Sequence, residues 1–214
     1  MFFNSIQHYN LDITRAALTG GSTLAPYLKA FNISLFLSLR ESDVQAAAGA
    51  GVAAALLYRK PQQADTPADQ EQIRIAFDGD AVIFSDESER IYQTEGVEAF
   101  ERHERDNAGK ALAAGPFAPL LKALAYIQAN FRSADGRVPI RTALVTARAS
   151  PAHERVIRTL SAWNVQIDET FFMGGVEKSA VLAAFQPHMF FDDQHGHCQL
   201  AAPLVQTGRV PGPA

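Results

Sequence analysis

Short apolar runs alternate with helix-compatible stretches along most of this 214-residue chain, and this alternation limits its fold more than any other feature. We expect strands at residues 73–77, 81–84, 140–145, 170–173 and 188–191. Helices are expected between them, at residues 87–107, 119–131, 151–163 and 176–185. Upstream, strand, helix and strand are predicted at residues 34–39, 41–48 and 51–57. Strands and helices that alternate at this spacing favour an α/β fold with a doubly wound parallel sheet.

The composition of residues 60–72 suggests a boundary within the chain. This segment contains two prolines and almost no apolar side chains, which is typical of an exposed linker. We therefore divide the chain into an N-terminal part, residues 1–59, and a larger part, residues 73–214. With 47% apolar and 20% charged residues, the whole sequence has the composition of a globular protein, which excludes disorder or a coiled coil as its dominant state.

Charge and cysteine content exclude several classes of partner. A formal net charge of −4 argues against a nucleic acid or an anionic membrane surface as the main partner. The longest near-apolar run, residues 46–58, is too short and too rich in alanine and glycine to cross a bilayer, and no secretion signal is visible. Cys198 is the single cysteine and cannot form an internal disulfide, so we expect a cytoplasmic location.

The N-terminal part is similar to a later part of the same chain. A shift of 154 residues, the distance from Gly20 to Gly174, aligns the two without a gap. The matched pairs include Gly20-Gly21 with Gly174-Gly175, Asn10 with Asn164 and Phe36 with Phe190. Charged residues of the later copy face neutral ones in the earlier copy: Lys178 faces Leu24, and Asp192-Asp193 face Ser38-Leu39. We predict that residues 1–59 are a degenerate half-repeat with a structural role. Coincidence between two strand–helix units with glycine turns is the alternative.

The densest chemical signal is Asp78-Gly79-Asp80, directly after the apolar strand at residues 73–77. Residues i and i+2 of an extended chain point to the same side, so the two carboxylates can converge on one small volume. Two like charges there need a cation or a shared proton, and hard carboxylate oxygens suit Mg²⁺. An Asp-Gly turn with solvated carboxylates is the alternative.

Three further polar motifs follow predicted strands. Thr146 ends a strand before a predicted helix start at Ser150-Pro151, where a hydroxyl and free N–H groups can bind an anion. Lys178 follows two glycines and can direct an ammonium at a phosphate. Asp192 and Asp193 follow a buried strand and repel each other unless a positive charge lies near them. All these motifs lie at the C-terminal ends of predicted parallel strands, where open α/β sheets bind their ligands.

The order Asp-x-Asp, Thr, Lys, Asp-Asp resembles the four motifs of the haloacid-dehalogenase-like phosphohydrolases. Residues 75–90, 142–148 and 190–194 are similar to the cytosolic 5′-nucleotidase, type I, family, and residues 4–15 look like the middle region of that family. The resemblance covers essentially all of residues 1–200. It implies the phosphohydrolase fold, with a small helical cap inserted at about residues 85–135. The position that would match Asp78 in the earlier copy falls before residue 1, so we expect a shortened relative of a longer protein.

The resemblance also implies a role for each motif residue. Asp78 would be the nucleophile that forms an aspartyl-phosphate, and Asp80 would be the general acid and then the general base. The residues that would hold the phosphoryl group are Thr146, Lys178, Gly79 and Ala147.

Mg²⁺ is the cofactor that the resemblance implies. Its ligands would be Asp78, the backbone carbonyl of Asp80 and one carboxylate of the final pair, with Asp193 favoured over Asp192. Together with Lys178, the ion would offset the charge of the phosphoryl group in the transition state.

Several other residues are expected to surround this site. Phe84, Ser85 and residues 89–90 are candidates for contact with the nucleoside. The charged stretch around His103 is expected to be a solvated helix face. Residues 195–198 are expected to form a surface loop near the site, with a transition-metal clip as the alternative.

The sequence therefore predicts a Mg²⁺-dependent phosphomonoesterase that releases phosphate from nucleoside 5′-monophosphates. A phosphatase for another small phosphate ester is one alternative, because the motifs do not specify the leaving group. A non-catalytic nucleotide-binding fragment is the other. The sequence does not decide which base and sugar the substrate carries. It also leaves the oligomeric state open, with a homo-oligomer as one alternative.

Overall fold

The fold is built on one seven-stranded sheet. The computed structural model describes residues 2–59, 72–149 and 152–212. The strands are β1 (Leu35–Ser38), β2 (Ala53–Leu57), β3 (Ile73–Phe77), β4 (Ile140–Thr146), β5 (Glu169–Phe172), β6 (Met189–Asp192) and β7 (Thr207–Arg209). Their order is β1-β2-β7-β6-β3-β4-β5, and all neighbours are parallel except β2 and β7. The expected α/β fold with a mostly parallel sheet is confirmed, while the antiparallel pair was not expected.

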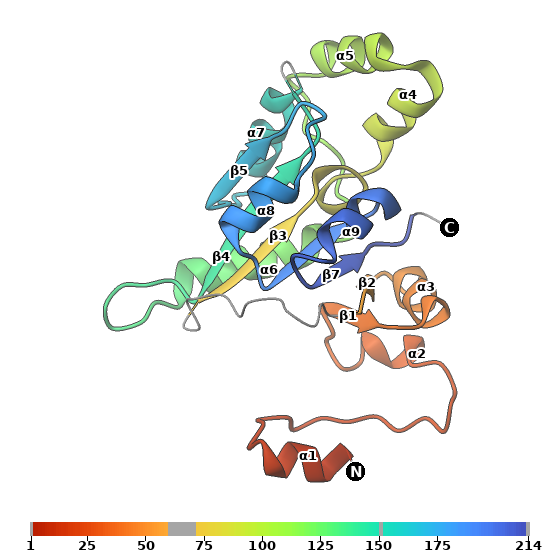
Figure 1. Ribbon diagram of the computed structural model, residues 1–214, viewed down its shortest axis with the longest axis vertical. Helices are drawn as coiled ribbons and strands as arrows, with labels where there is room; N and C mark the ends of the chain where they lie inside the picture. Colours follow the sequence, from red (N-terminus) through yellow and green to blue (C-terminus); the bar gives the residue numbers. More distant parts are fainter. Residues whose placement is uncertain (1, 60–71, 150–151, 213–214) are drawn as a thin grey trace.

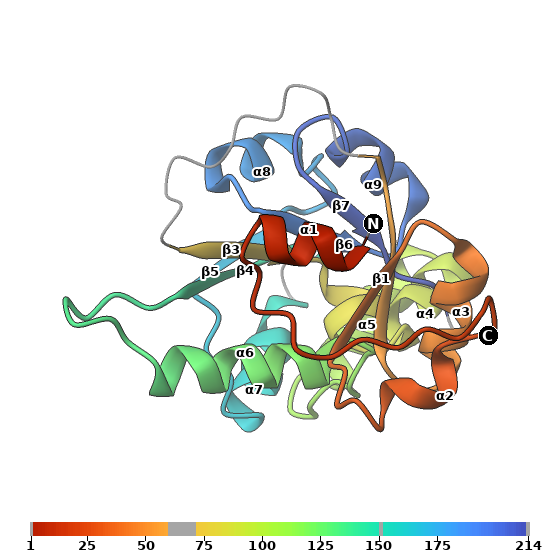
Figure 2. The ribbon, with the colours of Figure 1, turned by 90° about the horizontal axis from the view of Figure 1, so that it is seen from below.

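Helices cover both faces of the parallel part of the sheet. Helices α6 (Ala118–Asn130) and α7 (His153–Ala162) lie on one face, and α8 (Ser179–Phe185) and α9 (His195–Ala201) lie on the other (Figure 2). Successive strand residues point to opposite faces. Phe77 and Phe191 accordingly belong to the apolar cluster that includes α6 and α7, while Ala76 and Phe190 belong to the cluster that includes α8 and α9.

The N-terminal part contains α1 (Phe2–His8), α2 (Ala25–Leu28), α3 (Glu41–Gly49), β1 and β2. It joins the rest of the sheet through the antiparallel pair, in which Leu56 lies opposite Arg209. The hydroxyl of Tyr58 lies 2.7 Å from Nδ1 of His195 on α9, which adds a side-chain contact between the two parts. Helix α1 stands apart from the sheet, and residues 3–19 are mostly exposed (Figure 1).

The 154-residue shift also relates backbone conformations. Strands β1 and β6 begin at Leu35 and Met189, which are separated by this distance. Four pairs of residues with positive φ match under the same shift: Asn10 and Asn164 (47° and 54°), Gly20 and Gly174 (60° and 59°), Gly21 and Gly175 (95° and 82°), and Asn32 and Gln186 (53° and 51°). Non-glycine residues adopt this left-handed conformation uncommonly, so the agreement is informative. At these positions the backbones of the two segments have similar φ angles.

Residues 81–84 do not form the expected strand. Residues 81–83 belong to an irregular turn, η1 (Gly79–Ile83), in which Asp80 and Ala81 have non-helical backbone angles and Ala81 has a positive φ of 58°, and Phe84 then makes an isolated bridge with Ala114. Short apolar runs do not distinguish a buried strand from a buried helical turn. In the structure all four residues of the run are buried, and the amide of Phe84 donates to the carbonyl of Gly79 at 2.9 Å instead of joining a ladder.

The segment expected as one helix at residues 87–107 is divided into α4 (Glu87–Glu95) and α5 (Val97–Asp106). The break is at Gly96, whose φ of 85° a helix does not allow. The expected surface loop at residues 195–198 is wrong, because these residues belong to α9 and Cys198 is buried. The predicted helix start at Ser150-Pro151 and almost all of the linker, residues 60–71, lie outside the described residues.

Candidate active site

The predicted site residues meet at one rim of the sheet. Asp78 directly follows β3, Thr146 ends β4, and Asp192 ends β6. Because these strands are parallel neighbours, their carboxyl ends place the three side chains on the same rim. Lys178 reaches the rim from the loop between β5 and α8.

Lys178 lies between two carboxylates. Its Nζ donates to Oδ1 of Asp78 at 2.6 Å and to Oδ2 of Asp192 at 2.7 Å. Asp192 also accepts a hydrogen bond from the amide of Gln194 at 2.8 Å, and Nδ1 of His197 lies 3.2 Å from its Oδ2. The ammonium and both carboxylates are almost completely buried, so their interaction is only weakly screened by solvent.

Burial and neighbouring charges shift the pKa values of these groups in different directions. Burial raises the pKa of Asp78 to about 7, against the opposing effect of Lys178. Burial opposes ionisation of Asp192 as well, but the hydrogen bond from His197 and the charge of Lys178 outweigh it and lower the pKa of Asp192. Burial alone would lower the pKa of Lys178, but Asp78 and Asp192 raise it. The lysine therefore stays charged, and one ammonium faces more negative charge than it neutralises.

Asp193 completes an acidic cluster with Asp78 and Asp192. One carboxylate oxygen from each of the three lies within 4.8 Å of the others. Burial, together with the charges of Asp78 and Asp192, raises the pKa of Asp193 to about 8. Three hard oxygen donors so close together suit a divalent ion such as Mg²⁺, which would relieve their mutual repulsion. The donor set therefore fits the cofactor that the sequence led us to expect.

The predicted phosphate-binding residues lie next to this cluster. Thr146 is buried, and a Cβ atom on Gly79 would lie 3.1 Å from its Oγ1, so glycine at this position lets the two segments approach closely. Ala147 is exposed, and its carbonyl accepts a hydrogen bond from the amide of Gly175 at 3.0 Å. The loops that follow β4 and β5 are thus joined directly beside Thr146.

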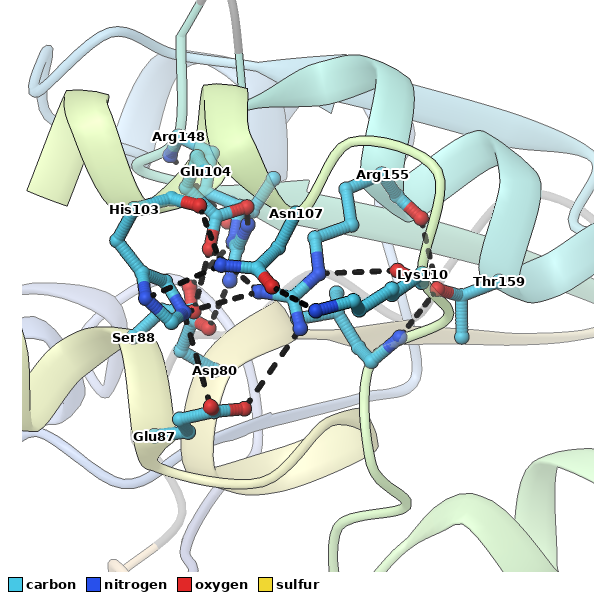
Figure 3. Close-up of polar contacts among 12 residues, drawn as sticks. Asp80, Glu87, Ser88, His103, Glu104, Asn107, Lys110, Arg148, Arg155 and Thr159 are labelled. Atoms are coloured by element: carbon cyan, nitrogen blue, oxygen red, sulfur yellow. Dashed lines mark hydrogen bonds and ion pairs between the residues drawn. The ribbon is translucent and has the colours of Figure 1, made fainter.

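The side chain of Asp80 does not join the acidic cluster. Both of its oxygens are bound by Arg148, with Nε 2.8 Å from Oδ2 and Nη2 2.6 Å from Oδ1 (Figure 3). Sequence analysis did not identify Arg148, nor Glu104, which is fully buried and also binds it. The expectation of a solvated helix face around His103 is therefore wrong for Glu104. Arg148 stands two residues after Thr146, and this proximity to a motif residue was the available signal.

A cavity of about 470 Å³ lies between the rim and the helices α4 and α5. Its lining from α4 and α5 consists of Glu89, Tyr92, Val97, Phe100 and Glu101, and its lining from the rim includes Asp80, Ala147, Arg148, Gly174, Gly175, Gln194 and His197. Helices α4 and α5 project beyond the end of the sheet (Figure 1). Of the residues expected to touch a nucleoside, Glu89 lines this cavity, Phe84 is fully buried, and Ser85 lines a separate cavity with Gly115.

Comparisons with known proteins identify the family of this chain. A family model described as 5′-nucleotidase matches residues 1–214. The chain belongs to the 5′-nucleotidase family. It is 40% identical over 204 residues to human "Cytosolic 5'-nucleotidase 1B", an alignment that covers 94% of this chain and 33% of that protein. This member of the 5′-nucleotidase family thus spans about a third of the length of the curated relative. No solved structure matches the chain.

In the described part of this 5′-nucleotidase family member, every helix is too short or too polar to cross a bilayer.

Proposed function

We propose that this chain hydrolyses nucleoside 5′-monophosphates to nucleoside and phosphate, with Mg²⁺ as cofactor. The observation that carries the proposal is the position of Lys178, between Asp78 and Asp192 and beside the acidic cluster. Phosphoryl transfer depends mainly on positioning and on neutralisation of charge, and this arrangement supplies both. The family and the name of the human relative support the nucleotide as substrate. The name of the relative also supports a cytoplasmic location.

In the proposed mechanism, Asp78 is the nucleophile. Its carboxylate oxygen forms a bond to phosphorus while the bond between phosphorus and the nucleoside oxygen breaks, and Asp80 gives a proton to the leaving oxygen. A water molecule then attacks the aspartyl-phosphate, Asp80 accepts its proton, and the bond between Asp78 and phosphorus breaks. Lys178 and the hydroxyl of Thr146 would bind the phosphoryl oxygens throughout.

Mg²⁺, when bound, would supply positive charge against the phosphoryl oxygens. The groups that would hold it are the carboxylates of Asp78 and Asp193 and the backbone carbonyl of Asp80, with Asp192 as the alternative to Asp193. Gly79 and Ala147 are assigned to the phosphate because they lie beside Thr146.

The same proposal divides the chain by role. Residues 73–214 would form the catalytic unit, with the cap at about residues 85–135, and the cavity between α4, α5 and the rim supports this assignment. Residues 1–59 would be a degenerate half-repeat, which the four pairs of left-handed residues support.

The nucleophile is tested by Asp78→Asn. We expect this variant to release no phosphate from AMP or IMP in the presence of Mg²⁺, while its circular dichroism and melting temperature show an intact fold. The matched control is Asp106→Asn, which removes an exposed carboxylate on α5 and should keep full activity. Undiminished turnover by Asp78→Asn would refute the assignment.

A panel of phosphate esters separates the remaining alternatives. Faster hydrolysis of sugar phosphates than of nucleoside 5′-monophosphates would favour a different small ester as substrate. A folded chain that binds AMP without hydrolysing any ester would favour a nucleotide-binding role, an alternative that gains weight because the chain spans 33% of its human relative.

A further inference from the structure

A buried ionic network connects the α4 and α5 helices to the rim of the sheet. Its centre is Glu104 on α5, whose side chain is completely buried. Oε1 of Glu104 accepts hydrogen bonds from Ser88 at 2.7 Å and from Arg155 at 2.9 Å, and Oε2 accepts one from Arg148 at 2.6 Å (Figure 3). These donors come from α4, from α7 and from the loop after β4. One carboxylate therefore fixes three segments relative to one another.

The guanidinium of Arg148 binds two carboxylates at once. Nη1 is used for Glu104, while Nε and Nη2 are used for the two oxygens of Asp80. The guanidinium is planar and rigid, so a carboxylate bound at two points takes its orientation from the position of the arginine. Among the described residues, Arg148 is the partner that hydrogen-bonds the Asp80 side chain. The orientation of Asp80 thus depends on Glu104, a residue of a different helix.

Stability alone is a weak reason for such a network. Transfer of charged groups into a protein interior costs several kcal/mol per ion, and buried ion pairs can often be replaced by apolar residues without loss of stability. Arg148 and Glu104 are nonetheless almost completely buried, and the chain they form ends on Asp80 at the wall of the cavity. Apolar residues in place of Arg148 and Glu104 could preserve stability, but they would not hold the carboxylate of Asp80 in a fixed orientation.

We propose that Glu104 is a positioning residue, which acts through Arg148 to direct the carboxyl group of Asp80 at the leaving oxygen of the substrate. This inference rests on the proposed function, because it concerns the proton that Asp80 gives to the nucleoside oxygen. It makes the productive orientation of Asp80 dependent on contact between α5 and the rim. Arg155 serves the same arrangement by holding the second oxygen of Glu104 and the carbonyl of Lys110.

The test compares two substrates that differ in their need for an acid. The nucleoside oxygen of AMP leaves as an alkoxide and needs a proton, whereas the phenolate of p-nitrophenyl phosphate leaves without one. The value of kcat/KM includes the steps up to formation of the aspartyl-phosphate and excludes the later attack of water. For Glu104→Gln we expect kcat/KM for AMP to fall by about 100-fold or more, the usual contribution of a general acid, and kcat/KM for p-nitrophenyl phosphate to change only a few-fold.

Three further variants complete the experiment. Arg148→Lys keeps the charge but loses the two-point contact, and should show the same difference between substrates. Asp80→Asn removes the proposed acid itself and shows how far its loss lowers kcat/KM for each substrate. Glu98→Gln changes an exposed glutamate in the first turn of α5 and should match the wild-type protein on both substrates. If circular dichroism shows that Glu104→Gln does not fold, the kinetics of Arg148→Lys on the two substrates test the inference instead.

The outcomes are distinguishable. An equal loss of kcat/KM on both substrates in the folded variants would mean a merely structural network and would overturn the inference, as would wild-type values on both. A wild-type protein that hydrolyses neither substrate would instead remove the proposed function, and this inference with it.

Discussion

A Cβ atom on Gly115 would lie 2.2 Å from the carbonyl oxygen of Phe84. The two backbones approach this closely because the segment around Gly115 is hydrogen-bonded to η1, the turn that begins within the Asp-Gly-Asp motif. The amide of Gly115 donates to Ile83 at 2.9 Å, and the amide of Phe117 donates to Val82 at 2.9 Å. Glycine at position 115 thus fixes the turn on which Asp80 stands.

We predict that Gly115→Ala destabilises the fold by about 1–3 kcal/mol or more, because the obstructing atoms belong to the backbone and cannot rotate away. Urea denaturation measures this change. The matched control is Gly109→Ala, where an added Cβ meets nothing within 4 Å and φ is not positive, so its stability should stay close to that of the wild type. Equal stability of both variants would contradict the close approach.

Mg²⁺ should stabilise the folded protein through the acidic cluster. Binding to the folded state alone adds about 2.7 kcal/mol at a concentration one hundred times Kd, so the melting temperature should rise with Mg²⁺ concentration. Asp193→Asn removes one of three clustered carboxylates and should reduce this rise. In the absence of divalent ions, the same variant should melt higher than the wild type, because asparagine at this buried position carries no charge and needs no bound proton. Asp106→Asn serves as the control, and an identical response of both variants to Mg²⁺ would disprove the site.

Stability at acid pH should depend on Glu104. Burial opposes its ionisation, but Arg148 and the hydrogen bond from Ser88 outweigh burial and lower the pKa of Glu104 below its ordinary value of 4.5. A carboxyl group whose pKa is lower in the folded state contributes stability above its unfolded pKa, and this contribution is lost as pH falls through the folded pKa. We expect the free energy of unfolding to fall below about pH 4.5.

The measurement is urea denaturation between pH 3 and pH 7. Glu104→Gln should be less stable than wild type at pH 7, and the difference should shrink toward pH 3. Glu98→Gln, with an exposed side chain on the same helix, should keep the wild-type dependence. A difference that stays constant over this range would show that ionised Glu104 contributes nothing.

Contact between the N-terminal part and α9 should depend in part on Tyr58. Its hydroxyl lies 2.7 Å from Nδ1 of His195, and a hydrogen bond of this kind contributes about 0.5–1 kcal/mol. Tyr58→Phe should lower the free energy of unfolding by this amount. The control is Tyr126→Phe, because Tyr126 is 64% exposed. Hydrogen exchange in β2 should increase only in the first variant, and unchanged exchange there would rule out a role for this contact.

Much of the candidate site could be predicted from the sequence because its residues follow recognisable apolar strands. Asp78, Thr146 and Asp192 each stand where a buried strand ends, and parallel strands bring such positions to one rim. The partners of Asp80 could not be predicted in this way. Glu104 and Arg148 lie 44 residues apart in the chain, and within the sequence Glu104 belongs to a charged stretch that is typical of a solvated helix.

Local sequence by itself determined most strands of the parallel sheet and the polar residues that follow them, because these properties follow from the spacing of apolar residues along a few strand positions. The tertiary structure alone decided that β2 pairs antiparallel with β7, that residues 81–84 turn instead of extending, and that Glu104 is buried against Arg148. These outcomes depend on which distant surfaces meet and exclude water, and the free energy of that contact belongs to the partners together and not to either segment alone.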